Sequence, residues 1–142
     1  MPTRQDWLLN FVAGTGPDAG WVDKLQIMKG MFLFQNEGKP PAEVNYRFQP
    51  YDYGPFTTEV YRDLDILVGA GVVQPSLDGK SFRVTPAGAA SLGRVLYERE
   101  QAQRLQELRS EVTQLSFRAL LKRVYEAHPE FATKSRARDV LQ

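Results

Sequence analysis

The stretch from residue 60 to residue 88 constrains the fold most, because helix, hairpin and helix-start signals follow one another there without a gap. Apolar residues recur at i, i+4, i+7 and i+8 and are followed by Gly69-Ala70-Gly71, which ends a helix. The pair Asp78-Gly79 favours a tight turn between strands, and apolar and polar residues alternate over 81–85. Thr85-Pro86 then supplies an N-cap and a proline at the first helical position. This pattern predicts a helix, a β-hairpin and a second helix in direct succession.

The rest of the chain is mostly helical in its patterning. Pro50 indicates that 44–53 is an edge strand or an extended loop, and Pro55 is placed to open the helix that follows. We therefore expect a mainly α chain with one small β-hairpin, an α+β fold, in a single domain spanning 1–142. Apolar periodicity predicts helices over 6–13, 22–35, 55–68, 87–115 with a break near Gly93, and 117–127.

The segment 61–73, the Asp78-Gly79 turn and the helix start Thr85-Pro86-Ala87-Gly88 together resemble one stretch of the bacterial winged-helix regulators. In that stretch a recognition helix ends with a glycine before a strand, a wing and a T-P-x-G helix start. The resemblance implies a winged helix-turn-helix core over about 5–90, extended by C-terminal helices over about 91–142. It also implies that the helix over 55–68 enters the major groove of DNA.

A second resemblance covers most of the chain. It rests on Lys24-Leu25-Gln26, on Tyr51-Asp52-Tyr53-Gly54-Pro55-Phe56 and on Val124-Tyr125-Glu126 before His128-Pro129-Glu130. These segments resemble an uncharacterised prokaryotic family with a Y-x-Y-G-P-F junction. The Y-G-P junction is also similar to that of Panacea-type domains, and this similarity implies an antitoxin-like, protein-binding role.

The chain carries few of the side chains that catalysis and metal binding need. It has no cysteine and one histidine, His128, which excludes disulfides, thiolate catalysis and cysteine zinc sites. His128 precedes Pro129 at a predicted helix end, where an imidazolium suits the helix dipole. Asp63 and Asp65 lie two apart on a helix and point in different directions. We expect no enzymatic activity, no cofactor and no metal.

The sequence gives no sign of a membrane partner. Its longest apolar stretch, 66–73, is far shorter than the roughly 20 residues of a membrane span. The first six residues lack the basic-then-apolar pattern of a signal peptide. We interpret the chain as a cytoplasmic domain.

Charge is distributed unevenly along the chain. Residues 1–79 contain 6 Lys and Arg against 10 Asp and Glu, and residues 80–142 contain 12 against 7. An anionic partner would meet the second half, although the two halves could also simply attract each other. Our first hypothesis is therefore DNA binding through the predicted wing and the basic second half. The residues assigned to it are Lys80, Arg83, Arg94, Lys134, Arg136 and Arg138.

The second hypothesis is a protein-interaction module. With its apolar residues turned inward, the helix over 55–68 would expose three acids and one arginine, a charge balance that repels DNA. Such a face would instead hold a basic protein partner. Fold analogy favours the first hypothesis and helix charge favours the second; we place DNA binding slightly ahead. The residues of this alternative site are Glu59, Arg62, Asp63 and Asp65.

Three further sets of residues have two interpretations each. Tyr51, Tyr53 and Phe56 could form a platform for a partner, but closing the core around Gly54 and Pro55 is favoured. Arginines spaced by five after residue 93 drift around a helix and indicate a solvated face rather than a phosphate track; they are Arg94, Arg99, Arg104 and Arg109. Leucine and valine at spacings of 3, 4 and 3 form either a homodimer seam or a core face; they are Leu105, Leu108, Val112 and Leu115.

Overall fold

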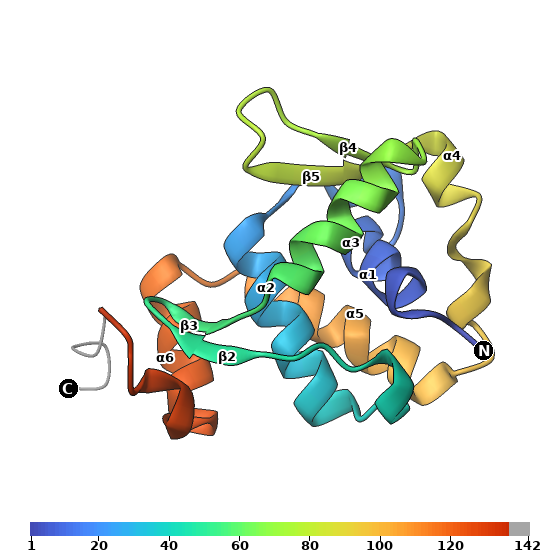
Figure 1. Ribbon diagram of the computed structural model, residues 1–142. Helices are drawn as coiled ribbons and strands as arrows, with labels where there is room; N and C mark the ends of the chain where they lie inside the picture. Colours follow the sequence, from blue (N-terminus) through green and yellow to red (C-terminus); the bar gives the residue numbers. More distant parts are fainter. Residues whose placement is uncertain (137–142) are drawn as a thin grey trace.

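The computed structural model describes residues 1–136, which form a mainly helical α+β structure with two small antiparallel sheets (Figure 1). The α-helices are α1 (Arg4–Ala13), α2 (Lys24–Leu33), α3 (Thr58–Gly69), α4 (Pro86–Ala89), α5 (Arg99–Thr113) and α6 (Phe117–Ala127). The strands are β1 (Val22–Asp23), β2 (Gln49–Tyr51), β3 (Gly54–Phe56), β4 (Val73–Pro75) and β5 (Ser81–Val84). Short turns of other helix types are η1 (Pro17–Ala19), η2 (Phe34–Gly38), η3 (Ala42–Val44), η4 (Leu92–Val95) and η5 (Pro129–Ala132). The predicted α+β class is confirmed.

The predicted hairpin is present as β4 and β5, and β1 joins it to give a sheet of order β1-β5-β4. Strand β1 corrects the prediction of a helix over 22–35. Val22 pairs with Phe82, and Asp23 is the N-cap of α2, in a reciprocal capping box with Gln26. The helix therefore begins at Lys24, because the cap ends the extended segment before it.

The second sheet corrects the predicted start of the 55–68 helix. Pro55 lies in β3 opposite Pro50 of β2, so neither proline opens a helix. Helix α3 begins at Thr58 instead, because the Thr57 side chain caps it by accepting a hydrogen bond from the Glu59 N–H. Asp52 and Tyr53 form the turn between the two strands, and Gly54, the first residue of β3, has a φ of +91°, a conformation that favours glycine.

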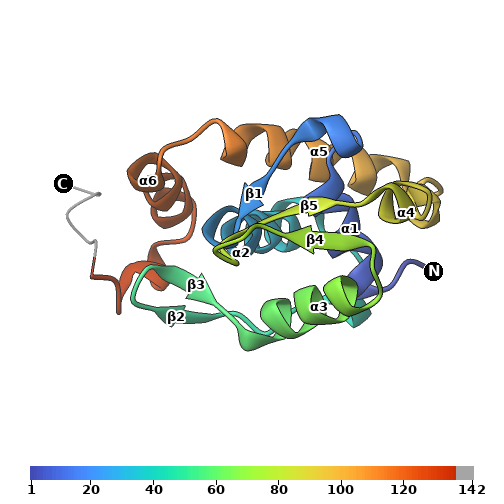
Figure 2. The ribbon, with the colours of Figure 1, turned by 90° about the horizontal axis from the view of Figure 1, so that it is seen from above.

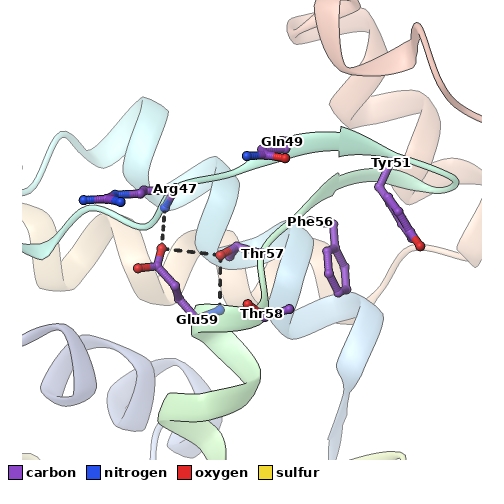
Figure 3. A pocket seen from close by; sticks show the side chains of 7 residues that line it. All are labelled: Arg47, Gln49, Tyr51, Phe56, Thr57, Thr58 and Glu59. Carbon is purple, nitrogen blue, oxygen red and sulfur yellow. Dashed lines mark hydrogen bonds between the residues drawn. The ribbon is translucent and has the colours of Figure 1, made fainter.

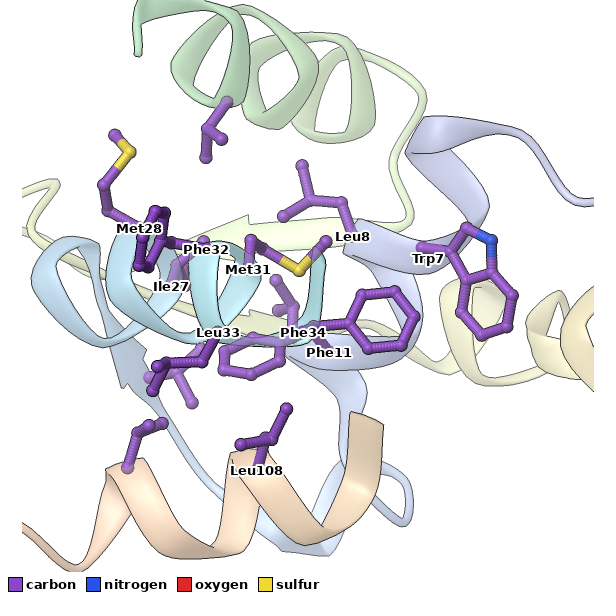
Figure 4. Close-up of a cluster of buried hydrophobic side chains, with 14 of the residues drawn as sticks. Trp7, Leu8, Phe11, Ile27, Met28, Met31, Phe32, Leu33, Phe34 and Leu108 are labelled. Carbon is purple, nitrogen blue, oxygen red and sulfur yellow. The ribbon is translucent and has the colours of Figure 1, made fainter. Parts of the chain in front are cut away.

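Helix α2 occupies the centre of the core, and together with α1 it lies between α3 on one side and α5 and α6 on the other (Figure 2). Its buried side chains meet those of α1 and α5 (Figure 4). Helix α6 has the predicted bounds, and the 87–115 segment is broken as expected into α4, η4 and α5. No helix in residues 1–136 has the length and hydropathy needed to cross a membrane.

Helix α5 turns its apolar face into this core. Leu105, Leu108 and Val112 are fully buried, and Leu115 packs at the edge of the same cluster. The homodimer-seam interpretation of these residues is therefore wrong, because their surface is already covered by the chain's own helices.

Arg109 also departs from the solvated face predicted for the α5 arginines. Its side chain is buried, and it donates hydrogen bonds to the carbonyl oxygens of Phe11 (2.7 Å) and Val12 (3.1 Å). These carbonyls belong to the last turn of α1, whose C-terminal end attracts a cation. Arg104 follows the prediction more closely, since it pairs with Glu107 three residues later, although it also binds Glu37.

Candidate functional site

Helix α3 and the β4–β5 hairpin lie side by side and enclose a shallow groove. Tyr61 and Leu64 line it from α3, and Pro75 and Phe82 line it from the hairpin. Lys24, at the start of α2, closes one end with its ammonium 5.1 Å from the centre of the Tyr61 ring. The predicted wing and the helix before it thus form a single surface of the molecule (Figure 1).

Asp63 does not belong to that surface, although the sequence places it on the solvent face of α3. The side chain is 1% exposed and points to α1. It accepts hydrogen bonds from the Tyr46 hydroxyl (2.7 Å), the Arg4 Nε (2.8 Å) and the Gln5 amide (3.0 Å). Burial, with Asp63 as the next cause, raises the pKa of Tyr46, so its hydroxyl remains a donor. Asp63 is a structural residue that joins α1 to α3.

Glu59 is also engaged within the molecule. Its carboxylate pairs with Arg4 at 3.2 Å and accepts a hydrogen bond from the Arg47 N–H at 2.8 Å (Figure 3). That backbone hydrogen bond, followed by the charge of Arg4, holds the pKa of Glu59 below its usual value. Because its charge is compensated locally, Glu59 contributes little to the field outside the molecule.

The acidic surface proposed for a basic partner is consequently absent. Of Glu59, Arg62, Asp63 and Asp65, only Arg62 and Asp65 are fully exposed, and their charges cancel. The same finding removes the electrostatic objection to DNA at α3. A helix pattern shows which residues are polar, but it does not show which polar residue finds a buried partner on another helix.

A cavity of about 430 Å³ lies at the start of α3, between that helix and β2 (Figure 3). Arg47 and Gln49 line it from the β2 side, and Thr58 lines it from α3. Arg47 and Gln49 are exposed, and they extend the polar surface of α3 beyond its first turn. The sequence analysis did not single out these two residues, because only the fold of 39–57 brings them beside α3.

The six residues proposed for DNA binding do not converge. Lys80 and Arg83 lie together on the hairpin, where Arg83 donates to Gln74 and stacks 4.5 Å from the centre of the Trp21 ring. Arg94 lies in η4, and Lys134 and Arg136 follow η5 at the other side of the molecule (Figure 1). Arg136 pairs with Asp52 at 3.3 Å. Arg138 lies outside the described residues.

The aromatic junction is partly a surface feature, which corrects the core role favoured for it. Gly54 and Pro55 are buried, but Tyr51 and Tyr53 are 55% and 45% exposed. Half-buried Phe56 stacks on Tyr51 with ring centres 5.1 Å apart. The short β2–β3 hairpin has one face against α2 and α6, so the rings at its tip have little core to enter.

Lys29 is the residue that the sequence analysis missed most clearly. It lies in the middle of α2, is 3% exposed and donates a hydrogen bond from Nζ to the Pro55 carbonyl oxygen at 2.9 Å. Burial lowers the pKa of Lys29 to about 8. The available signal was its position among the apolar residues of 22–35. A lysine is rarely buried unless its charge is paired, so a lysine within a buried helix is unusual.

This pKa shift makes stability depend on pH in a defined direction. The free energy of unfolding should rise, relative to that of Lys29→Met, as the pH increases above about 8. In that range the unfolded chain still holds the proton that the folded chain has released, whereas below it both states are protonated. Urea unfolding of both proteins at about pH 7 and about pH 9.5 measures the difference. A difference that stays constant or falls would contradict the expectation.

Comparison with protein-family models, with curated proteins and with solved structures gives no match for this chain. The functional argument therefore rests on the residues and the geometry described above.

Proposed function

We propose that this chain is a non-enzymatic winged-helix protein that binds duplex DNA, with α3 as the helix in the major groove and the β4–β5 hairpin as the wing. The observation that carries the proposal is the order of the elements around one sheet. Helices α1, α2 and α3 precede the hairpin, and β1, between α1 and α2, pairs with β5 to give the order β1-β5-β4. A winged-helix domain has this connectivity, here with the β2–β3 hairpin inserted before α3.

The charge of the exposed side chains supports the same surface. On α3 and the hairpin the exposed charged residues are Arg62, Lys80 and Arg83 against Asp65 and Asp78. Lys24 and Arg47, also exposed, flank α3 and add two further cations. The resulting excess of cations suits contact with phosphates, which supply most of the affinity in non-specific DNA binding.

The predicted readout is modest. Arg62 and Thr58 are the exposed polar residues on the outward side of α3 that could reach base edges, whereas Lys80 is placed for a phosphate. A surface of this kind binds DNA mainly through its backbone, so the affinity falls steeply with salt. The alternative of a basic protein partner on the acidic face of α3 has lost its basis, because Asp63 is buried.

Fluorescence anisotropy with a mixed-sequence duplex tests the proposal. The wild type should bind with a dissociation constant of about 1–100 µM at a salt concentration of about 150 mM, and clearly more tightly when the salt is lowered to about 50 mM. Absence of binding at low salt would overturn the proposal.

A charge-reversal pair locates the surface. Arg62→Glu with Lys80→Glu should weaken binding at least tenfold and lower the salt slope by about 1, since the phosphate contact of Lys80 is lost. Arg99→Glu with Lys122→Glu makes the same change of net charge on α5 and α6, away from α3 and the hairpin. Equal weakening by the two pairs would show that net charge, and not this surface, controls binding.

A further inference from the structure

Within residues 1–136 the ammonium group of Lys29 has no counter-ion. Its one hydrogen bond within residues 1–136 goes to the Pro55 carbonyl oxygen, and no carboxylate in that part of the chain lies within 4.0 Å of its Nζ. An ammonium has three N–H donors, so two are not accounted for by this contact. Burying a charge without pairing it is costly, and a bound anion would relieve that cost.

Lys29 also borders a cavity of about 260 Å³, which shares Tyr61 with the groove between α3 and the hairpin. Its walls come from three elements that are distant in sequence. Leu25 belongs to α2, Tyr51, Tyr53 and Phe56 belong to the β2–β3 hairpin, and Tyr61 belongs to α3. Among the described residues, the cavity is lined mainly by aromatic rings, and Lys29 supplies its cationic group. This combination favours an apolar molecule that carries one negative charge.

Gly54 keeps the space beside Lys29 open. A Cβ at this position would lie 3.5 Å from the Lys29 Cε and 3.2 Å from the Tyr125 ring. Among the described residues, Asp52 supplies the carboxylate on the cavity wall, and it pairs with Arg136 at 3.3 Å, so its charge is compensated. An entering anion therefore meets the charge of Lys29 without an unpaired acid beside it.

We propose that this cavity binds a small aromatic carboxylate, with the carboxylate on the Lys29 ammonium and the ring among Tyr51, Phe56 and Tyr61. The volume lies below the roughly 300–1,000 Å³ of pockets for drug-sized ligands, which favours a ligand with one ring. A single ammonium satisfies a carboxylate better than a phosphate, which usually takes several donors. The ligand is a free small molecule, since the cavity has little room for a chain end.

Benzoate and benzamide are the probes that test this site, because they share a ring and differ in charge. In a titration of the full chain at about pH 7 followed by NMR, benzoate should shift the amide signals of Gly54 and Tyr61 saturably. Benzamide should bind at least tenfold more weakly. Equal affinity for the two probes, or no saturable shift at Gly54 and Tyr61 with benzoate, would overturn the proposal.

Two variants separate the ligand site from a purely structural role of Lys29. Lys29→Met shortens the side chain by one atom and removes its charge, and it should reduce benzoate affinity at least tenfold to the level of benzamide. Lys122→Met, at an exposed site on α6, should leave it unchanged. If Lys29→Met does not fold, Tyr53→Ala, at an exposed position, provides the test by loss of a cavity wall. Benzoate affinity that survives in every folded variant would exclude the site.

Discussion

Replacement of Asp63 by alanine should lower the free energy of unfolding by about 3–5 kcal/mol, the usual cost of removing one partner from a buried ion pair. The variant leaves Arg4 and Tyr46 without the acceptor that both reach in the wild type, at 2.8 and 2.7 Å. The hydroxyl of Tyr46 is buried, so water cannot easily replace the lost carboxylate. The contact between α1 and α3 should loosen as a result.

Asp65→Ala is the matched control for this prediction, since it removes the same group from the same helix two residues away. Asp65 is exposed and should change stability by no more than about 0.5 kcal/mol. Urea unfolding followed by circular dichroism measures both variants. Similar small effects at the two positions would mean that Asp63 is not paired in the interior.

Replacement of Gly88 by alanine should cost about 3 kcal/mol, at the upper end of the range for overpacking. The new Cβ would lie 2.1 Å from the carbonyl oxygen of Val72 and 2.7 Å from the Val84 side chain. The Val72 carbonyl is held in place, because it accepts the hydrogen bond of the Thr85 N–H at 3.1 Å. The backbone must therefore move, either at Val72 before β4 or at Gly88 in α4. This contact is a physical reason for the glycine in the Thr85-Pro86-Ala87-Gly88 segment.

Gly69→Ala provides the control for Gly88→Ala. Gly69 is also helical, at the end of α3, but a Cβ there would meet no atom within 4 Å. Alanine at this position should be neutral or stabilise the protein by up to about 1 kcal/mol, because it restricts the unfolded chain. Thermal unfolding of the two variants should give shifts of opposite sign or very different size. A Gly88→Ala protein as stable as the wild type would contradict the close packing of α4 on the hairpin.

Sequence alone was sufficient for the elements whose signals are local. The β4–β5 hairpin, the Thr85 cap and the bounds of α6 depend on residues within a few positions of one another, and all three are confirmed, although the hairpin connection spans 76–80 rather than Asp78-Gly79 alone. Turn geometry and capping are fixed by near neighbours along the chain. Lys80 and Arg83 on the hairpin could be found for the same reason, because the hairpin that carries them is a local structure.

Tertiary structure decided which polar groups are buried. Helical spacing predicts that Asp63 and Arg109 face the solvent, yet each has a partner on α1, which is distant in sequence. The acceptor of Lys29, the Pro55 carbonyl oxygen, likewise belongs to a distant element, β3. Each burial depends on how one helix is rotated against another, and an amphipathic pattern does not contain that rotation.

The candidate sites also differ in how much of them local sequence signals can locate. Such signals are enough to locate the hairpin with Lys80 and Arg83, and the helix that precedes it. Only the tertiary structure placed Arg47 beside α3 and enclosed Lys29 among the aromatic rings of three elements. The physical reason is that secondary structure follows from interactions between near neighbours, whereas a site depends on contacts that form when distant segments pack together.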